Sequence, residues 1–197
     1  MQQFDSKLKI QAELDSDFTP AVLWNRAYKK LVEQSTESID IQLALLRPDN
    51  TVSVFKTSVL PLSAATQELT IKFVERQLKF LLWQKGACKV LVAGSAEIAD
   101  ELAAIYSPQG RRAFDYEFFP KVYSRPLEIV SWNEEMPASK EVSMPLGRNL
   151  DGCRIGFDLG GSDRKCAATI DGKVVFSEEI EWNPYFENNP QYHIDGI

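Results

Sequence analysis

Hydrophobic and polar positions in the first two thirds of the chain follow two periods. Apolar residues spaced three and four apart, as on one face of a helix, predict three helices. These stretches are residues 19–33, 63–85 and 95–105. Alternating or continuous short apolar runs predict five strands. These are residues 39–46, 51–60, 89–93, 114–122 and 127–132. Because helices and strands alternate, we expect an N-terminal α/β domain, residues 1–132, in which helices cover a mixed sheet.

Turn and capping residues mark the ends of these elements. Thr19 followed by Pro20 is typical of a helix N-cap and first helical residue, and Ser95 is expected to cap the third helix. Residues 47–50, Arg-Pro-Asp-Asn, supply turn residues between the first two strands, which predicts a β-hairpin. Gly86 stands where a helix C-terminus favours glycine.

The composition changes between residues 133 and 150. This stretch is rich in Glu, Lys, Ser and Pro and has few large apolar groups. Such a composition favours a linker. The alternative is an irregular surface loop within one domain. The linker interpretation leaves residues 151–197 as the incomplete start of a second domain.

Residues 154–176 have the pattern of two or three antiparallel strands. Ile155, Phe157 and Leu159 share one face, so Asp158 lies on the opposite face. The dipeptide at residues 171–172, Asp-Gly, is strongly associated with a type I′ hairpin turn, whose two central residues need positive φ. We therefore expect a second, tightly turned β-structure after the linker.

The segment Asp-Leu-Gly-Gly-Ser at residues 158–162 carries candidate chemistry. Two successive glycines at a strand-to-strand turn let backbone N–H groups approach a phosphate as a small anion-binding nest. A carboxylate beside a polyphosphate is repelled unless a cation lies between them, so Asp158 is a candidate Mg²⁺ ligand. The candidate nucleotide-binding residues are Asp158, Gly160, Gly161, Ser162, Arg164 and Lys165. The alternative is an ordinary turn that Asp158 caps.

The run 155–176 resembles the first phosphate motif of the superfamily of sugar kinases, heat-shock ATPases and actin. Its D-x-G-G-S opening is similar to that of ROK (repressor, open reading frame, kinase) proteins, over about residues 151–182. The resemblance implies that residues 151–197 begin an actin-like (ribonuclease H-like) ATPase domain that uses ATP and Mg²⁺. It also implies that Asp158 is linked to the metal, that residues 160–162 contact phosphate, and that a sugar is the second ligand.

One position departs from the family pattern. ROK proteins commonly have Lys directly after the Ser or Thr, whereas this chain has Asp163, which adds a carboxylate beside the phosphate site. The family's later phosphate, catalytic and sugar-contact segments follow the hairpin, and this chain ends at Ile197. We therefore expect the N-terminal part of a ROK-like ATP-dependent sugar kinase, inactive alone because half a cleft positions no transition state. No catalytic residue is assigned.

Two other functions stay open. One is a non-catalytic ROK-like protein that senses a sugar or a nucleotide, which would fit Asp163. The other is a protein-interaction module in which the hairpin is purely structural. An apolar face that awaits a C-terminal lobe would also favour a homo-oligomer.

Charge and hydropathy indicate which classes of partner to expect. The formal net charge is −6, so there is no basic surface of the kind that binds nucleic acid. The first residues contain no apolar core of a signal peptide, and no apolar run approaches the length of a membrane span. We therefore expect a cytoplasmic protein without a nucleic-acid or membrane partner.

The cysteines and the histidine suggest no separate site. Cys88, Cys153 and Cys166 show no C-x-x-C spacing, so we expect reduced, mostly buried thiols rather than a disulfide framework or a zinc site. His193 is the only histidine. Without clustered partners, such a residue is usually a surface or packing residue.

Overall fold

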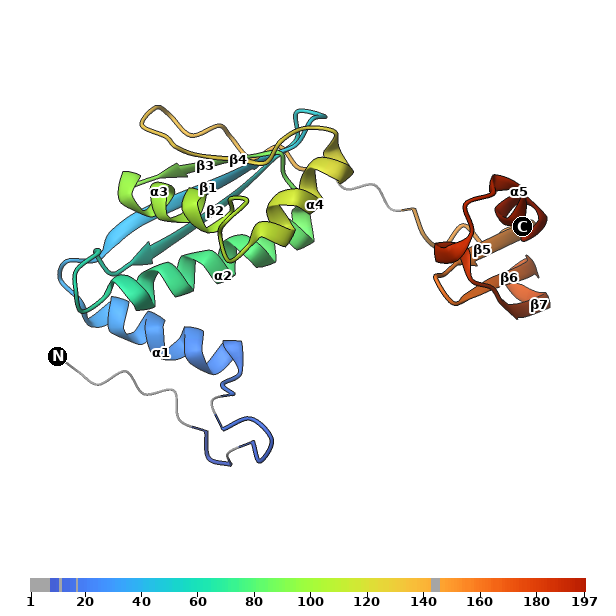
Figure 1. Ribbon diagram of the computed structural model, residues 1–197, viewed down its shortest axis with the longest axis horizontal. Coiled ribbons are helices and arrows are strands. Elements are labelled where there is room, and N and C mark those ends of the chain that lie inside the picture. Colours follow the sequence, from blue (N-terminus) through green and yellow to red (C-terminus); the bar gives the residue numbers. More distant parts are fainter. Residues whose placement is uncertain (1–7, 11, 17, 143–145) are drawn as a thin grey trace. The chain divides into compact units, whose positions relative to one another are not determined.

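The chain folds into two compact units, Met1–Val142 and Ser143–Ile197 (Figure 1). The computed structural model describes residues 8–10, 12–16, 18–142 and 146–197. The predicted linker, residues 133–150, spans the division between the units. Part of it belongs to the first unit, because the backbones of Lys140 and Val52 form an isolated antiparallel bridge.

The first unit is an α/β structure with a mixed sheet. Its described elements in chain order are α1 (Ala21–Gln34), β1 (Ile39–Leu46), β2 (Val52–Val59), α2 (Gln67–Lys85), β3 (Lys89–Ala93), α3 (Ala96–Ile105), α4 (Ala113–Tyr123) and β4 (Glu128–Ser131). The strand order is β2-β1-β3-β4. β1 pairs antiparallel with β2 and β3, whereas β3 and β4 are parallel. The expected α/β class is thus confirmed, and four of the five predicted strands are found within one residue at each end.

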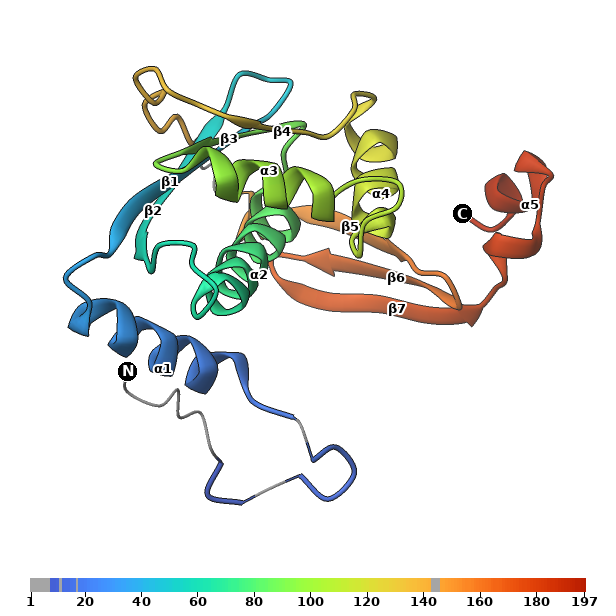
Figure 2. The same ribbon diagram turned by 60° about the vertical axis from the view of Figure 1, so that its left-hand side comes forward.

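The core of this unit lies between the sheet and the helices. Leu43 and Leu45 of β1 stand opposite Val92 and Val90 of β3, so these four side chains share one face of the sheet. They belong to a single buried cluster to which all four helices contribute. Figure 2 shows α2 and α3 on the same side of the sheet. The helices therefore cover one sheet face, and burial of this apolar surface stabilises the unit.

Three of the predicted turn and cap residues lie where the sequence places them. Asn50 has a φ of 62° and donates its N–H to the carbonyl of Arg47 at 3.1 Å, which closes the hairpin turn. Gly86 follows α2 with a φ of 73°, and a Cβ atom there would lie 1.6 Å from the Tyr123 hydroxyl. The Ser95 hydroxyl accepts the N–H of Ile98 at 3.2 Å and so caps α3.

Two helix starts differ from the prediction. Pro20, not Thr19, is the N-cap residue of α1, and no side chain caps that end. The second helix begins at Gln67 rather than Ser63, because a local turn precedes it. The Thr66 hydroxyl hydrogen-bonds to that of Ser63 at 2.8 Å and donates to the carbonyl of Pro61. Such side-chain bonds compete with helical backbone hydrogen bonds.

The prediction of a strand at residues 114–122 is wrong, because this segment is α4. Its aromatic residues favour strands locally, but they pack at helical spacing. Phe114 and Phe118, four residues apart, both stack on Trp83 of α2, with ring centroids 6.5 Å and 5.1 Å from it. Tertiary packing against α2 therefore overrides strand propensity, even with Pro120 inside the helix.

The second unit is an antiparallel sheet with a short helical tail. Its elements are β5 (Cys153–Leu159), β6 (Asp163–Ile170), β7 (Lys173–Glu181), the 3₁₀ helix η1 (Pro184–Phe186) and α5 (Pro190–Asp195). The strand order is β5-β6-β7. Asp171 and Gly172 have φ values of 47° and 77° between β6 and β7, which confirms the predicted turn.

Among the residues that the structure describes, no helix is long and apolar enough to cross a bilayer.

Candidate functional site

The sheet of the second unit has one polar face, on which Asp158 lies. Asp158 of β5 stands opposite Lys165 of β6, which stands opposite Glu179 of β7. The next row, Gly156, Ala167 and Ser177, consists of small residues. Directly paired residues direct their side chains to the same face. The polar face therefore carries a charged row beside a row of small side chains.

A shallow depression of about 510 Å³ lies over these two rows. Asp158, Lys165 and Glu179 line it together with the small residues. A Cβ atom added to Gly156 would meet no other atom within 4 Å, so the glycine leaves the depression open. The carboxylates of Asp158 and Glu179 outnumber the single ammonium group of Lys165. A bare phosphate would therefore be repelled here, whereas a phosphate accompanied by a divalent cation would not.

The segment after β7 forms hydrogen bonds with the turn between β5 and β6. Trp182 donates its indole N–H to the carbonyl of Gly160 at 2.7 Å and its backbone N–H to the carbonyl of Ser162 at 3.1 Å. A Cβ atom on Gly161 would lie 2.4 Å from the Tyr185 ring. Neither Gly160 nor Gly161 has a positive φ. Gly161 is therefore required for close packing rather than for a left-handed backbone.

The amide groups of this turn face no protein acceptor. Within the described part of the chain, no hydrogen bond is donated by the backbone N–H of Gly160, Gly161 or Ser162. Gly161 and Ser162 are exposed. Trp182 donates to the carbonyl oxygens of Gly160 and Ser162, so the peptide group that carries the N–H of Gly161 has a fixed orientation. Consecutive free N–H groups at a rigid turn can bind the oxygen atoms of an anion.

The Asp163 carboxylate contacts two of the side chains that the sequence assigns to phosphate binding. Lys165 Nζ lies 2.5 Å from Asp163 Oδ1, and the Ser162 hydroxyl donates to Asp163 Oδ2 at 3.2 Å. Lys165 Nζ also lies 3.5 Å from Glu179 Oε1. The hydrogen bond from Lys165 lowers the pKa of Asp163, and the same bond raises the pKa of Lys165. A phosphate would have to compete with Asp163 for both donors.

Arg164 is not brought to the Asp158 face. It pairs with Leu159 and Ile180, one residue away from the register of the charged row, so it shares the apolar face with them. It is half-buried there, and its Nε atom has no hydrogen-bond partner among the described residues. Of the six predicted residues, five lie on or beside the turn and the polar face, and Arg164 lies on the other.

The sequence assigned no role at this site to Ser177, Glu179 and Trp182. The first two reach the site only through the pairing of β6 with β7, whose register shifts between Ala168 and Thr169. Trp182 reaches it by folding back on the turn. A hairpin built outward from Asp171-Gly172 without the shift would have misaligned β7 by one residue.

A metal ion at this face would be coordinated by few protein ligands. Within the residues described, no group of three or more His, Cys, Asp or Glu side chains is arranged to hold a metal ion. Asp158 can therefore contribute one carboxylate to Mg²⁺, and the remaining ligands would have to be water and phosphate oxygens, which Mg²⁺ accepts readily.

The remaining candidates serve packing. The ring of His193 meets that of Trp182 edge-on, with centroids 6.0 Å apart, so this histidine packs against the residue that holds the turn. The three cysteines are free. The expectation of mostly buried thiols is wrong for Cys153, which is exposed, whereas Cys88 and Cys166 are half-buried.

No protein-family model, no curated protein and no solved structure matches this chain.

Proposed function

We propose that the second unit binds the phosphates of a Mg²⁺-nucleotide and forms the opening strands of an actin-like ATPase domain in a ROK-like sugar kinase. The observation that carries this proposal is the turn at residues 160–162, whose backbone N–H groups have no acceptor among the described residues. The same turn directly follows β5 and begins at Gly160, two residues after Asp158. Free amides thus follow the Asp158 carboxylate closely along the chain.

The charges of the polar face favour a metal-bound nucleotide over a free anion. Asp158 and Glu179 flank the depression, and Lys165 is already paired with Asp163. In this proposal Asp158 holds Mg²⁺ or one of its waters, and the cation bridges the carboxylate to the phosphate oxygens. The amides of the turn then bind the oxygen atoms that the metal leaves free.

Sugar phosphorylation by the 197-residue chain alone is not expected. Phosphoryl transfer depends on positioning and electrostatic stabilisation from both walls of a cleft. The hairpin supplies one wall and no base for a sugar hydroxyl. We therefore expect nucleotide binding without sugar-dependent ATP turnover above background.

Calorimetric titration of the chain with Mg²⁺-ADP tests the proposal. We expect saturable binding that Asp158→Ala weakens at least about tenfold, because the metal loses its protein ligand. Asp151→Ala is the matched control, since Asp151 is an exposed carboxylate of the same unit outside its strands, and it should leave binding unchanged. Absence of binding, or an equal loss in both variants, would contradict the proposal and favour a structural hairpin.

A second candidate is a ROK-like protein that senses a nucleotide or sugar without turnover. The observation that favours it is the pairing of Asp163 with both Ser162 and Lys165. Without Asp163, the Ser162 hydroxyl could donate a hydrogen bond to a phosphate, and Lys165 could neutralise part of the phosphate charge. The two candidates differ in whether Asp163 restrains phosphate contact or helps to hold the metal, and substitution of Asp163 separates them.

A further inference from the structure

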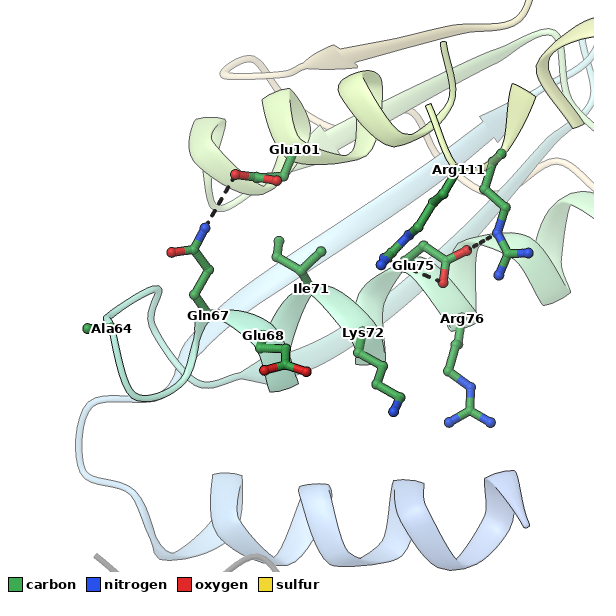
Figure 3. Close-up of a pocket in the computed structure, with 10 residues that line it drawn as sticks. Ala64, Gln67, Glu68, Ile71, Lys72, Glu75, Arg76, Glu101 and Arg111 are labelled. Carbon is green, nitrogen blue, oxygen red and sulfur yellow. Dashed lines mark hydrogen bonds and ion pairs between the residues drawn. The ribbon is translucent and has the colours of Figure 1, made fainter. Parts of the chain in front are cut away.

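The first unit carries a groove of about 840 Å³ that the hairpin proposal does not use. It runs along α2 and is bordered by α3 and the loop between α3 and α4. Figure 3 shows Gln67 and Glu101 at one end of it and Glu75 and Arg111 at the other. The two ends differ in charge, and this difference indicates what the groove can bind.

A buried carboxylate fixes the cationic end. Glu75 of α2 is only 3% exposed. It accepts a hydrogen bond from Nε of Arg112 at 2.5 Å, and Nη2 of Arg111 lies 3.9 Å from its second oxygen. One carboxylate thus pairs with two guanidinium groups. It neutralises only part of their positive charge, and the rest can attract a ligand. The pair also holds Arg112 in place, because removing either partner would leave a charge without compensation.

Two further cations extend this end along α2. Nζ of Lys72 lies 5.4 Å and Cζ of Arg76 lies 5.6 Å from the ring centroid of Trp24, which belongs to α1. Cation–π contacts of this kind restrict both side chains. Among the residues that the structure describes, neither cation has a carboxylate oxygen within 4.0 Å. The groove is therefore lined by four cationic side chains and three carboxylates, and of these carboxylates only Glu75 forms an ion pair with any of the four cations among the described residues.

The opposite end offers hydrogen-bond acceptors and an amide. The Gln67 side chain donates to Oε1 of Glu101 at 3.3 Å, and Glu68 lies in the next position of α2. Ile71, 7% exposed, separates the two ends. Carboxylate and amide oxygens accept hydrogen bonds from hydroxyl groups, which a phosphate lacks when fully ionised.

We propose that this groove binds a phosphorylated, hydroxyl-bearing small molecule, with its phosphate at Arg76 and Arg111 and its hydroxyl groups at Gln67 and Glu101. Guanidinium groups bind phosphate through paired, charge-assisted hydrogen bonds, which accounts for the arginines at one end. The acceptors at the other end select the organic part. The site lies in a different unit from the hairpin and does not depend on nucleotide binding there.

Titration of the intact chain with glucose 6-phosphate, inorganic phosphate and glucose, at constant ionic strength, tests this site. Two-dimensional NMR of the ¹⁵N-labelled chain follows the arginine Nε–H and the Trp24 indole signals. We expect saturable shifts with both phosphates, at least about tenfold tighter binding of the sugar phosphate, and none with glucose alone. Equal affinity for the two phosphates, or no saturation with either, would overturn the proposal.

Variants separate a built site from general charge attraction. Arg76→Gln with Arg111→Gln should weaken both phosphates at least about tenfold. Lys56→Gln with Arg125→Gln removes the same charge from exposed positions away from the groove and should have no effect. Equal losses in the two double variants would refute a specific site.

Arg111→Gln alone, at a side chain 56% exposed, repeats the test without disturbing the Trp24 contacts. Glu101→Gln should weaken the sugar phosphate and leave inorganic phosphate unchanged.

Discussion

The two units use the same alternating strand pattern with opposite results for burial. In the first unit, β1 and β3 direct their apolar residues against helices, and Leu43, Leu45, Val90 and Val92 are fully buried. In the second unit, Ile155 and Phe157 of β5 alternate in the same way but are 69% and 54% exposed. Every buried apolar side chain among the described residues lies between positions 24 and 127.

This difference shows that a strand pattern predicts an apolar face and not what covers it. No described apolar side chain of the second unit is buried, and its sheet is joined by backbone pairing and by the turn contacts of Trp182. A sheet whose apolar face stays open gains little from the hydrophobic effect. We therefore expect the first unit to unfold cooperatively from its core, and substitutions in the second unit to alter binding more than stability.

The largest expected effect comes from emptying the core of the first unit. Phe73 is fully buried and stacks on Tyr28 with ring centroids 4.6 Å apart. Phe73→Ala should lower the free energy of unfolding by about 3–5 kcal/mol, since it removes contacts and leaves a cavity. Phe157→Ala, the same change on the exposed face, should cost less than about 1 kcal/mol. Urea unfolding followed by circular dichroism measures both. Equal costs would show that the apolar face of β5 is covered.

The next effect comes from a buried hydroxyl. The Tyr28 hydroxyl lies 2.8 Å from the Thr70 hydroxyl and accepts the N–H of Leu60 at 3.0 Å. Tyr28→Phe should lower the free energy of unfolding by about 1–2 kcal/mol, because the N–H of Leu60 loses its acceptor in a buried place. Tyr185→Phe is the matched control in the second unit, where Tyr185 is 83% exposed, and it should change stability by less than about 0.5 kcal/mol. A cost for Tyr28→Phe no larger than that of the control would show that water replaces the lost contact.

A third effect depends on pH. Burial raises the pKa of Tyr106 above its ordinary value of 10.0, and the charges of Glu75 and Asp115 raise it further. The unfolded phenol ionises near pH 10 while the folded one stays protonated, so stability is full below pH 10 and falls as the pH rises beyond it. Tyr106→Phe should remove a loss of about 1 kcal/mol between pH 9 and 11, measured as the urea midpoint. An unchanged pH dependence in the variant would assign the loss to other groups.

Local chemistry made the turns and caps predictable. Asn50 and the Asp171-Gly172 pair take positive φ because these residue types tolerate it, and Ser95 caps α3 because its hydroxyl reaches the Ile98 N–H. The helix α4 was not predictable in this way. Its aromatic residues are stabilised as a helix by Trp83, which is 30 or more positions earlier in sequence. Contacts of that kind leave no local signal.

The residues of the candidate site also fall into two groups, those suggested by local sequence and those that depend on distant contacts. Asp158 and the glycines of the turn are candidates because of their order along one strand and its turn, and the sequence alone suggests them. The depression beside Asp158 depends on Ala167 and Ser177 meeting Gly156 across three strands, and this requires a register that only the folded sheet defines. The same register places Arg164 and Lys165 on opposite faces.

The smallest expected effect on stability is at Asp163. Because this residue lies in the second unit, we expect its substitution to change Mg²⁺-ADP binding rather than stability. The pair with Lys165 is exposed, so Asp163→Asn should change the free energy of unfolding by less than about 0.5 kcal/mol. It should release Ser162 and Lys165 toward a phosphate and tighten Mg²⁺-ADP binding several-fold, measured by calorimetry with Asp151→Asn as the control. Weaker binding would instead mean that Asp163 helps to hold the metal, and would remove the observation that favours a sensor.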